Sequence, residues 1–242
     1  MASLRAGGWT PTHLPLLAID PLDPLPLAQR RRVLDLDRYA HLIFVSANAA
    51  RVGLERIQDY WPRFPARQRY WAVGQSTARV LEAAGLQVER PERDMRSEGL
   101  LALPGLQQVQ GQRALIVRGE GGRQLIARTL RARGARVDSL CCYRRVPVSH
   151  RAQEVVARVA AERADLIMIS SGEGLELLSD LLRPRQHTTL AAITLLAPSP
   201  RVAERARDLG WQRVELSDNA SDAAMLAAAR RWQARHSVEA KH

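Results

Sequence analysis

The sequence predicts an α/β protein made of two similar, doubly wound parallel sheets, and three observations support this fold class. The 242 residues suffice for two domains of about a hundred residues each. Short apolar runs alternate along the chain with segments of helical spacing. The two halves also resemble each other at a fixed offset, which indicates an internal repeat.

The repeat is carried by three separate blocks that share an offset of about 125 residues. The matched pairs are residues 4–21 with 130–147, LIFVS at 42–46 with LIMIS at 166–170, and AVGQSTARVLEAAG, ending at Gly85, with LLAPSPRVAERARDLG, ending at Gly210. Because three independent blocks agree, the two halves are expected to share one fold.

Each copy alternates buried strands with helices. Residues 114–117 (ALIV) and 166–169 (LIMI) form short continuous apolar runs, typical of parallel strands that are covered on both faces. Residues 124–133 have helical spacing and end at Gly134, as a helix with a glycine C-cap would. Strand–turn–helix units in series predict a parallel sheet with helices on both faces, twice.

The offset also predicts that the first copy lacks its opening strand. The second copy opens with strand 114–117 and the turn 118–122, and the counterparts of both would precede Met1. An opening strand usually lies near the centre of a doubly wound sheet, so its loss would expose its neighbours. We therefore expect the natural chain to begin upstream and Met1 to be an internal start.

The composition is that of an ordinary globular protein, with 46% hydrophobic and 25% charged residues. No apolar run approaches the roughly 18 residues of a membrane span, and the N-terminus lacks the apolar region of a secretory signal. These features predict a cytoplasmic protein that does not bind membranes, and we expect a monomer. The adjacent Cys141 and Cys142 cannot easily bridge each other and are expected to be small buried strand residues.

The net charge of +11 leaves two interpretations open, a nucleic-acid surface or a field that attracts a small polyanion. Lys241 is the sole lysine, and the arginines are scattered through the helices instead of forming one tract. The chain has no recognition-helix pattern and no basic motif interleaved with aromatic residues. We therefore expect no nucleic-acid partner.

Seven segments, in this order and spacing, resemble the uroporphyrinogen-III synthase family: PLLAIDPL, LIFVSANAARVG, WAVGQSTARVLEAAG, LIVRGEGGRQLIARTLRARGARV, the CCYRR strand, ISSGEGLELL and APSPRVAERARDLG. The resemblance implies two flavodoxin-like domains joined by a two-stranded linker. Residues 1–19 and 149–242 would form one discontinuous domain, and residues 20–148 would form a second domain inserted into it.

The resemblance further implies a substrate, hydroxymethylbilane, a flexible linear tetrapyrrole with many carboxylates, and a possible transient handover from hydroxymethylbilane synthase. Turns between strand ends and helix N-termini offer backbone N–H groups to anions. At each turn, ordinary helix capping is the alternative to ligand binding. Capping is the weakest alternative at the glycine-rich RGEGGR, where the backbone amides are open to a ligand. The candidate binding residues are Ser46, Asn48, Gly74, Ser76, Thr77, Arg118, Gly119, Gly121, Gly122, Arg123, Ser170, Ser171, Gly172, Ser199 and Arg201.

Tyr143 corresponds to the strand-end tyrosine of the family, and the resemblance implies that its phenol donates a hydrogen bond to the departing hydroxyl. The alternative is an aromatic residue that only packs on a linker strand. Some family members carry a Thr-Thr pair where this chain has Arg201 and Val202, so Ser199 is the hydroxyl that remains for a role at that turn. No histidine shows metal-ligand spacing, and no cofactor or metal is expected.

Two other function classes remain open at this point. One is a two-lobed binding protein for a small polyanionic ligand without catalysis. It would bind hydroxymethylbilane without changing which isomer forms. The other is a nucleic-acid-binding module, which a salt-dependent gel shift would detect.

Overall fold

The structure is a computed structural model that describes residues 2–92, 94–182 and 192–239. The chain divides into two compact units, and the first of them is discontinuous in sequence. Unit 1 comprises Met1–Ala18 and Pro147–His242, and unit 2 comprises Ile19–Val146. The mixed α/β architecture with mostly parallel sheets that the alternating pattern predicts is confirmed.

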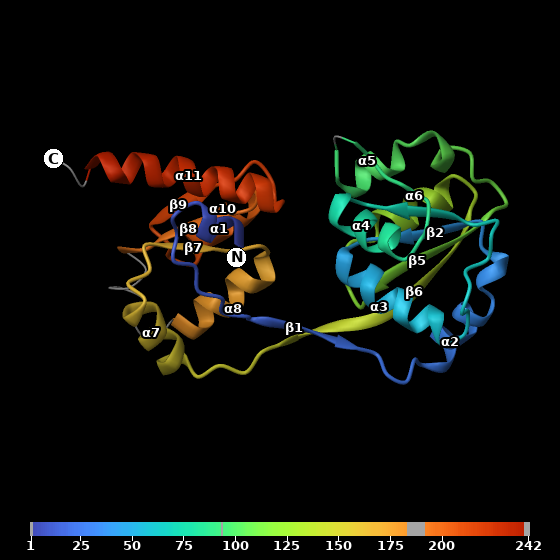
Figure 1. The fold of residues 1–242 in the computed structure, drawn as a ribbon, viewed down its shortest axis with the longest axis horizontal. Coiled ribbons are helices and arrows are strands. Elements are labelled where there is room, and N and C mark those ends of the chain that lie inside the picture. Colours follow the sequence, from blue (N-terminus) through green and yellow to red (C-terminus); the bar gives the residue numbers. More distant parts are fainter. Residues whose placement is uncertain (1, 93, 183–191, 240–242) are drawn as a thin grey trace. The chain divides into compact units, whose positions relative to one another are not determined.

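Unit 2 is built on a six-stranded sheet with the strand order β1-β6-β5-β2-β3-β4 (Figure 1). The β2–β3, β2–β5, β3–β4 and β5–β6 pairs are parallel. Counted from β5, the order of β6, β5, β2, β3 and β4 is the 2-1-3-4-5 order of flavodoxin-like sheets. The strands are β1 (Leu17–Pro21), β2 (His41–Phe44), β3 (Arg69–Ala72), β4 (Val88–Glu89), β5 (Arg113–Gly119) and β6 (Arg136–Pro147).

Helices cover both faces of this sheet because successive strand residues point to opposite sides. Leu42 and Phe44 of β2 pack in one apolar cluster with residues of α2, α3 and α4. Ile43, between them, packs in a second cluster with residues of α5 and α6. The helical elements are α2 (Leu27–Leu34), η1 (Leu36–Arg38), α3 (Ala47–Gln58), α4 (Gln75–Ala83), α5 (Ser97–Leu101), η2 (Pro104–Leu106) and α6 (Leu125–Ala132).

The predicted helix end at Gly134 is confirmed. Helix α6 ends at Ala132, and Gly134 has a φ of 82°, a left-handed conformation that glycine adopts without steric cost. The chain can therefore turn directly from α6 into β6.

Unit 1 contains a parallel sheet with the order β7-β8-β9. Leu196 of β8 packs against α11 on one face, and Leu195 and Ala197 pack against α8 and α10 on the other. Trp232 of α11 donates its indole N–H to the Thr194 hydroxyl at 3.1 Å. The elements are α1 (Ala2–Ala6), α7 (Ala152–Ala161), β7 (Leu166–Met168), α8 (Gly172–Leu182), β8 (Thr194–Ala197), α10 (Pro200–Asp208), β9 (Arg213–Leu216) and α11 (Asp222–Glu239).

The edge strand β7 differs from its counterpart β2 in its pairing. Among the described residues β7 pairs with β8 alone, whereas β2 lies between β5 and β3. All three residues of β7 are partly exposed, while all four of β2 are buried. The opening strand that the repeat predicts stays a prediction.

Two local expectations differ from the structure. Residues 17–19, which were expected to belong to the domain of residues 1–19 and 149–242, are part of β1, which lies beside β6 in the six-stranded sheet of unit 2. Asp20 accepts a hydrogen bond from Arg144 at 2.7 Å, and the Leu22 N–H donates to the Cys142 carbonyl at 2.9 Å. Strand β6 is hydrogen-bonded to β1 as well as to β5 and runs to Pro147, so Tyr143 is not at its end.

None of the helices within the described ranges is both long and apolar enough to cross a membrane.

Candidate active site at the strand ends of unit 2

The carboxyl ends of three neighbouring strands in unit 2, and the adjoining part of β6, carry the residues that the sequence predicts for chemistry. Ser46 follows β2, Gly74 follows β3, Gly119 ends β5, and Tyr143 is the last β6 residue that is paired with β5. Because the paired strands are parallel, their carboxyl ends meet at one edge of the sheet, the usual ligand edge of open α/β folds.

Ser46 and Tyr143 contact each other at this edge. Ser46 caps α3, and its Oγ accepts the Ala49 backbone N–H at 3.0 Å. The same oxygen lies 3.3 Å from the phenol oxygen of Tyr143, although the two residues are 97 positions apart. Tyr143 is only 6% exposed, so packing holds its ring while its hydroxyl reaches Ser46.

An irregularity in the β5–β6 pairing aims Tyr143 at this position. Arg118 is paired with Cys141, but the next residue, Gly119, is paired with Tyr143, so β6 has one extra residue, Cys142. Such a bulge redirects the side chains that follow it. The Glu120 N–H donates to the Tyr143 carbonyl at 2.8 Å and fixes the backbone there.

Gly119 leaves the space that the Tyr143 ring fills. A Cβ at Gly119 would lie 2.6 Å from both Cε2 and Cζ of that ring, closer than carbon atoms approach without displacement. The glycine is required here by contact, since its backbone φ is not in the left-handed region. The first glycine of RGEGGR therefore positions the tyrosine in addition to opening the turn.

The two arginines of RGEGGR have different environments. Arg118 is 6% exposed and its guanidinium donates to the carbonyl of Gly121 and, at 3.3 Å, to those of Gly119 and Arg123. Arg123 is largely exposed and lies 4.0 Å from Glu98. Arg118 thus shapes the turn, whereas Arg123 offers its charge to solvent.

The remaining glycines give the turn its conformation. Gly121 and Gly122 have φ values of 73° and 79°, which side-chain-bearing residues rarely adopt. No Cβ covers the backbone amides of these two residues, an arrangement suited to anions.

The polar side chains in the turns after β2 and β3 differ in how accessible they are to a ligand. The Asn48 side-chain oxygen accepts from Arg51 at 2.5 Å, so this amide is held by a neighbour on its own helix. At the start of α4, Gly74 occupies the N-cap position without a side-chain cap, Ser76 is exposed, and Thr77 is 3% exposed. The buried Thr77 hydroxyl matches the capping and packing alternative better than ligand binding.

The candidate turns of unit 1 follow β7 and β8, which are paired neighbours. Ser171 Oγ accepts the Gly174 N–H at 3.1 Å and so acts as a helix cap, while Ser170 is exposed. Ser199 precedes α10 without a side-chain cap bond, and Arg201 is exposed on that helix. These two turns form a second group of N–H donors, which belongs to unit 1.

The cysteine thiols next to Tyr143 are not activated. Burial raises the pKa of the Cys142 thiol to about 12 and also raises the pKa of Cys141. Because the thiolate is the reactive form, neither side chain is suited to nucleophilic chemistry at neutral pH. Within the described part of the chain, no group of His, Cys, Asp and Glu side chains is arranged to hold a metal ion.

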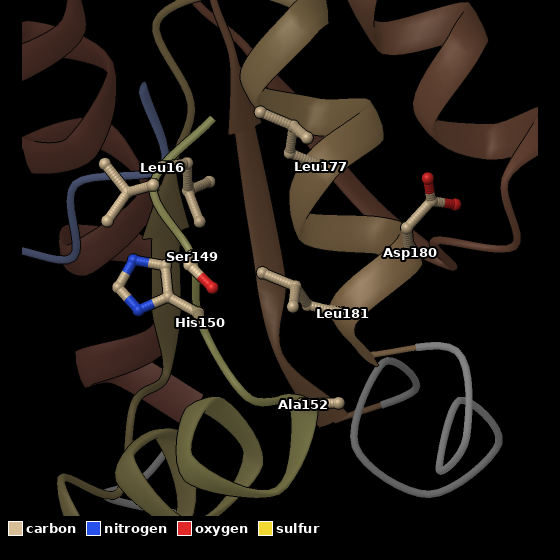
Figure 2. A pocket seen from close by; sticks show the side chains of 8 residues that line it. Leu16, Ser149, His150, Ala152, Leu177, Asp180 and Leu181 are labelled. Atoms are coloured by element: carbon tan, nitrogen blue, oxygen red, sulfur yellow. The ribbon is translucent and has the colours of Figure 1, made fainter. Parts of the chain in front are cut away.

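A pocket of about 370 Å³ in unit 1 is lined by none of the candidate residues described above (Figure 2). Figure 2 shows His150 and Asp180 on opposite sides of it, with Leu177 and Leu181 of α8 between them. Its lining is mainly aliphatic, and none of the eight residues that line it is an arginine that could pair with a substrate carboxylate. We therefore choose the strand ends of unit 2 as the candidate site, because the residues there suit the expected chemistry. The volume of the pocket in unit 1 does not decide the choice.

Sequence reasoning missed two residues that border this site. Glu98 of α5 lies 4.0 Å from Arg123, and a Cβ on Gly74 would lie 3.5 Å from that of Met95. Both contacts join segments that are distant along the chain, so no local pattern indicates them.

Comparison with known proteins agrees with the predicted family. The family described as uroporphyrinogen-III synthase HemD matches residues 1–227. Uroporphyrinogen-III synthase of Escherichia coli K12 is 37% identical over 233 residues, covering 94% of this chain and 93% of the relative. The synthase of Synechococcus elongatus is 28% identical and covers 93% of this chain and 88% of that relative.

Solved structures share the fold. A mutant uroporphyrinogen III synthase from the extremely thermophilic bacterium Thermus thermophilus superposes with a TM-score of 0.59 at 21% identity, covering 97% of this chain and 93% of that one. Uroporphyrinogen-III synthetase from Helicobacter pylori gives a TM-score of 0.61 at 14% identity, covering 90% and 92% of the two chains.

Proposed function

This chain belongs to the uroporphyrinogen-III synthase family, and we propose that it performs its chemistry at the strand ends of unit 2, around Tyr143. The enzyme is a cyclising hydro-lyase of tetrapyrrole biosynthesis, which closes hydroxymethylbilane to uroporphyrinogen III with inversion of ring D and loss of water. The alternative of a binding protein without catalysis is not favoured by these relationships.

The observation that carries the proposed site is the convergence of Tyr143, Ser46 and Gly119 at one sheet edge. Of these three residues, Tyr143 is the one with a phenol group. Packing holds its ring in place, and Ser46 contacts its hydroxyl. A positioned phenol can donate a proton to a leaving hydroxyl. The proposed role of Tyr143 is therefore that of general acid for the departure of water.

The turns supply the anion donors for a substrate rich in carboxylates. Backbone N–H groups at the start of α3 and α4, together with the amides of Gly121 and Gly122, can bind carboxylates near the helix N-termini. The exposed Arg123 adds a positive charge to the same edge, and the net charge of +11 favours the encounter. The turns after β7 and β8 provide similar donors within unit 1.

The proposed reaction begins when the Tyr143 proton passes to the terminal hydroxyl, which leaves as water while the pyrrole nitrogen supplies electrons and an azafulvene cation forms. Ring D attacks through its substituted carbon, and the spiro intermediate fragments and recloses with ring D inverted. Since the substrate also closes without a catalyst, to the uninverted isomer, the enzyme acts chiefly by orienting the reacting carbons. The reaction is redox-neutral, so it needs no electron donor or acceptor.

We further propose that the enzyme works in the cytoplasm as a monomer and takes its substrate by transient handover from hydroxymethylbilane synthase. The reason is chemical: free hydroxymethylbilane cyclises to the wrong isomer, so a short time in solution is advantageous. The two units are proposed to be the two domains of the sequence repeat.

A coupled assay tests the proposed function. Hydroxymethylbilane is generated in the presence of this protein, the products are oxidised, and the porphyrin isomers are separated by chromatography. Mostly isomer III is expected with the protein and isomer I without it. Isomer I alone in both samples would contradict the proposal.

A further inference from the structure

Ser46 holds a hydrogen-bonding position that connects a helix end to Tyr143. Its Oγ already accepts the Ala49 N–H at 3.0 Å, one of the free N–H groups at the start of α3. A serine hydroxyl has one proton to donate and two lone pairs. With one lone pair engaged by Ala49, its proton can be directed to the phenol oxygen of Tyr143, 3.3 Å away.

The direction of this bond decides what Tyr143 can do. If Tyr143 donates to Ser46, its proton is engaged and is not available to a substrate. If Ser46 donates to Tyr143, the phenol proton is free to point out of the protein toward a leaving group. Only the second arrangement is compatible with Tyr143 as an acid.

From this geometry we infer that Ser46 is a positioning residue of the reaction, which donates its hydroxyl proton to the Tyr143 oxygen and holds the phenol ready to act as an acid. The inference rests on the proposed role of Tyr143 and assigns Ser46 a part other than direct contact with a substrate carboxylate. The relay runs from the Ala49 N–H to Ser46 and from the Ser46 hydroxyl to Tyr143.

The relay stabilises the charge that develops during the acid step. When the Tyr143 O–H bond breaks, its proton joins the departing hydroxyl, the carbon–oxygen bond breaks toward that oxygen, and water leaves. The negative charge on the phenol oxygen then faces the Ser46 O–H, which is itself polarised by the positive end of α3. Ring closure later releases a proton from the attacked pyrrole carbon, and this proton returns to the phenolate.

The Ser46–Tyr143 hydrogen bond is a long one. At 3.3 Å the oxygen pair is longer than the about 2.7–2.8 Å usual for hydroxyl hydrogen bonds. We expect the pair to shorten in the substrate complex, as catalytic hydrogen bonds often do. Gly119 leaves room for the ring in this position, because a Cβ there would lie 2.6 Å from Cε2 and Cζ.

A double-mutant cycle tests the relay, with kcat and KM for isomer III formation measured in the wild type, Ser46→Ala, Tyr143→Phe and the double variant. We expect Ser46→Ala to lower kcat about tenfold with little change in KM, since only the transition state carries the new charge. In the Tyr143→Phe background the same substitution should change kcat by less than about twofold.

Two further variants separate the relay from helix capping. Ser46→Thr keeps both the cap and the hydroxyl and should restore kcat to within about threefold of the wild type. Ser221 caps α11 through the Ala224 N–H at 3.3 Å. Ser221→Ala therefore removes a cap without a tyrosine partner, and kcat should stay unchanged.

The outcomes distinguish failure of the relay from failure of the proposed acid. An equal loss from Ser46→Ala in both backgrounds, or a loss expressed in KM alone, would show that Ser46 acts independently of Tyr143 and would overturn the inference. An unchanged kcat in Tyr143→Phe would instead remove the acid role from Tyr143, and the relay with it.

Discussion

The Oγ of Ser46 and the phenol oxygen of Tyr143 lie 3.3 Å apart, Ser46 just after β2 and Tyr143 at the last β6 residue that is paired with β5. The contact needs a helix cap after β2 and an extra residue in β6, and the extra residue lies where the β5–β6 pairing ends. It places one phenol beside the N-terminus of α3 and beside the glycine-rich turn. This relationship generates the first two predictions below.

Tyr143→Phe should slow isomer III formation by about tenfold to a hundredfold, because the variant keeps the buried ring but has no proton to give. The free energy of unfolding should change little. Steady-state rates and urea denaturation would measure the two effects. Tyr60→Phe, which alters an exposed tyrosine, serves as the control and should retain the full rate. Undiminished turnover in Tyr143→Phe would count against the acid role.

Gly119→Ala should also lower kcat by about tenfold to a hundredfold, because the new methyl group displaces the Tyr143 ring. In the Tyr143→Phe background it should add little, since the hydroxyl is already missing. Gly85→Ala is the matched control: its φ of 81° makes alanine strained, yet nothing lies within 4 Å of the new Cβ. That variant should lose stability and keep its kcat. If both alanine variants lost turnover equally, the effect would be one of stability alone.

Arg118→Met should destabilise the enzyme by about 2 kcal/mol, because three carbonyls of the turn lose a charged donor that is itself buried. Urea denaturation followed by circular dichroism would give the free energy of unfolding. Arg123→Met, on the exposed arginine of the same turn, should change it by less than about 0.5 kcal/mol. Equal losses of stability from the two variants would contradict the conclusion that Arg118 holds the turn together while Arg123 does not.

The stability of unit 2 should fall in mild acid because of His41. This histidine is 2% exposed, and burial is the main cause that lowers its pKa below 6.5. Its Nδ1 accepts from the Trp71 indole at 3.1 Å, so the neutral ring donates through Nε2 to Gln112.

The unfolded chain therefore binds a proton at a higher pH than the folded chain does. The stabilisation is complete above pH 6.5 and is progressively lost as the pH falls below that value. Urea denaturation at pH 7.5 and pH 5.5 should show a smaller pH effect for His41→Gln than for the wild type. An identical pH dependence in both proteins would exclude His41 as its source.

The two cysteines should react slowly with a thiol-specific reagent in the native protein. Burial raises the pKa of Cys142 to about 12, and the pKa of Cys141 is raised as well, so little thiolate is present at pH 8. Reaction with a chromogenic disulfide should become fast in urea, where both thiols are exposed. Fast native labelling would mean that this part of β6 opens readily.

The local features of the fold could be predicted from sequence because each depends on neighbouring residues. Apolar runs indicated β5 and β7, helical spacing indicated α6, and Gly134 marked the end of that helix. The repeat and the seven segments indicated the family. Strand ends followed by small or polar residues located the candidate turns, since parallel strands place those ends at one edge.

The arrangement within the site was decided by tertiary structure alone. The bulge at Cys142, the burial of Arg118 within its own turn and the pairing of Ser46 with Tyr143 depend on strand register and on packing between distant segments. A one-residue change in register redirects every following side chain, and a linear pattern does not encode it. Sequence therefore determined which residues are available for chemistry, and the β5–β6 register determined which of them meet.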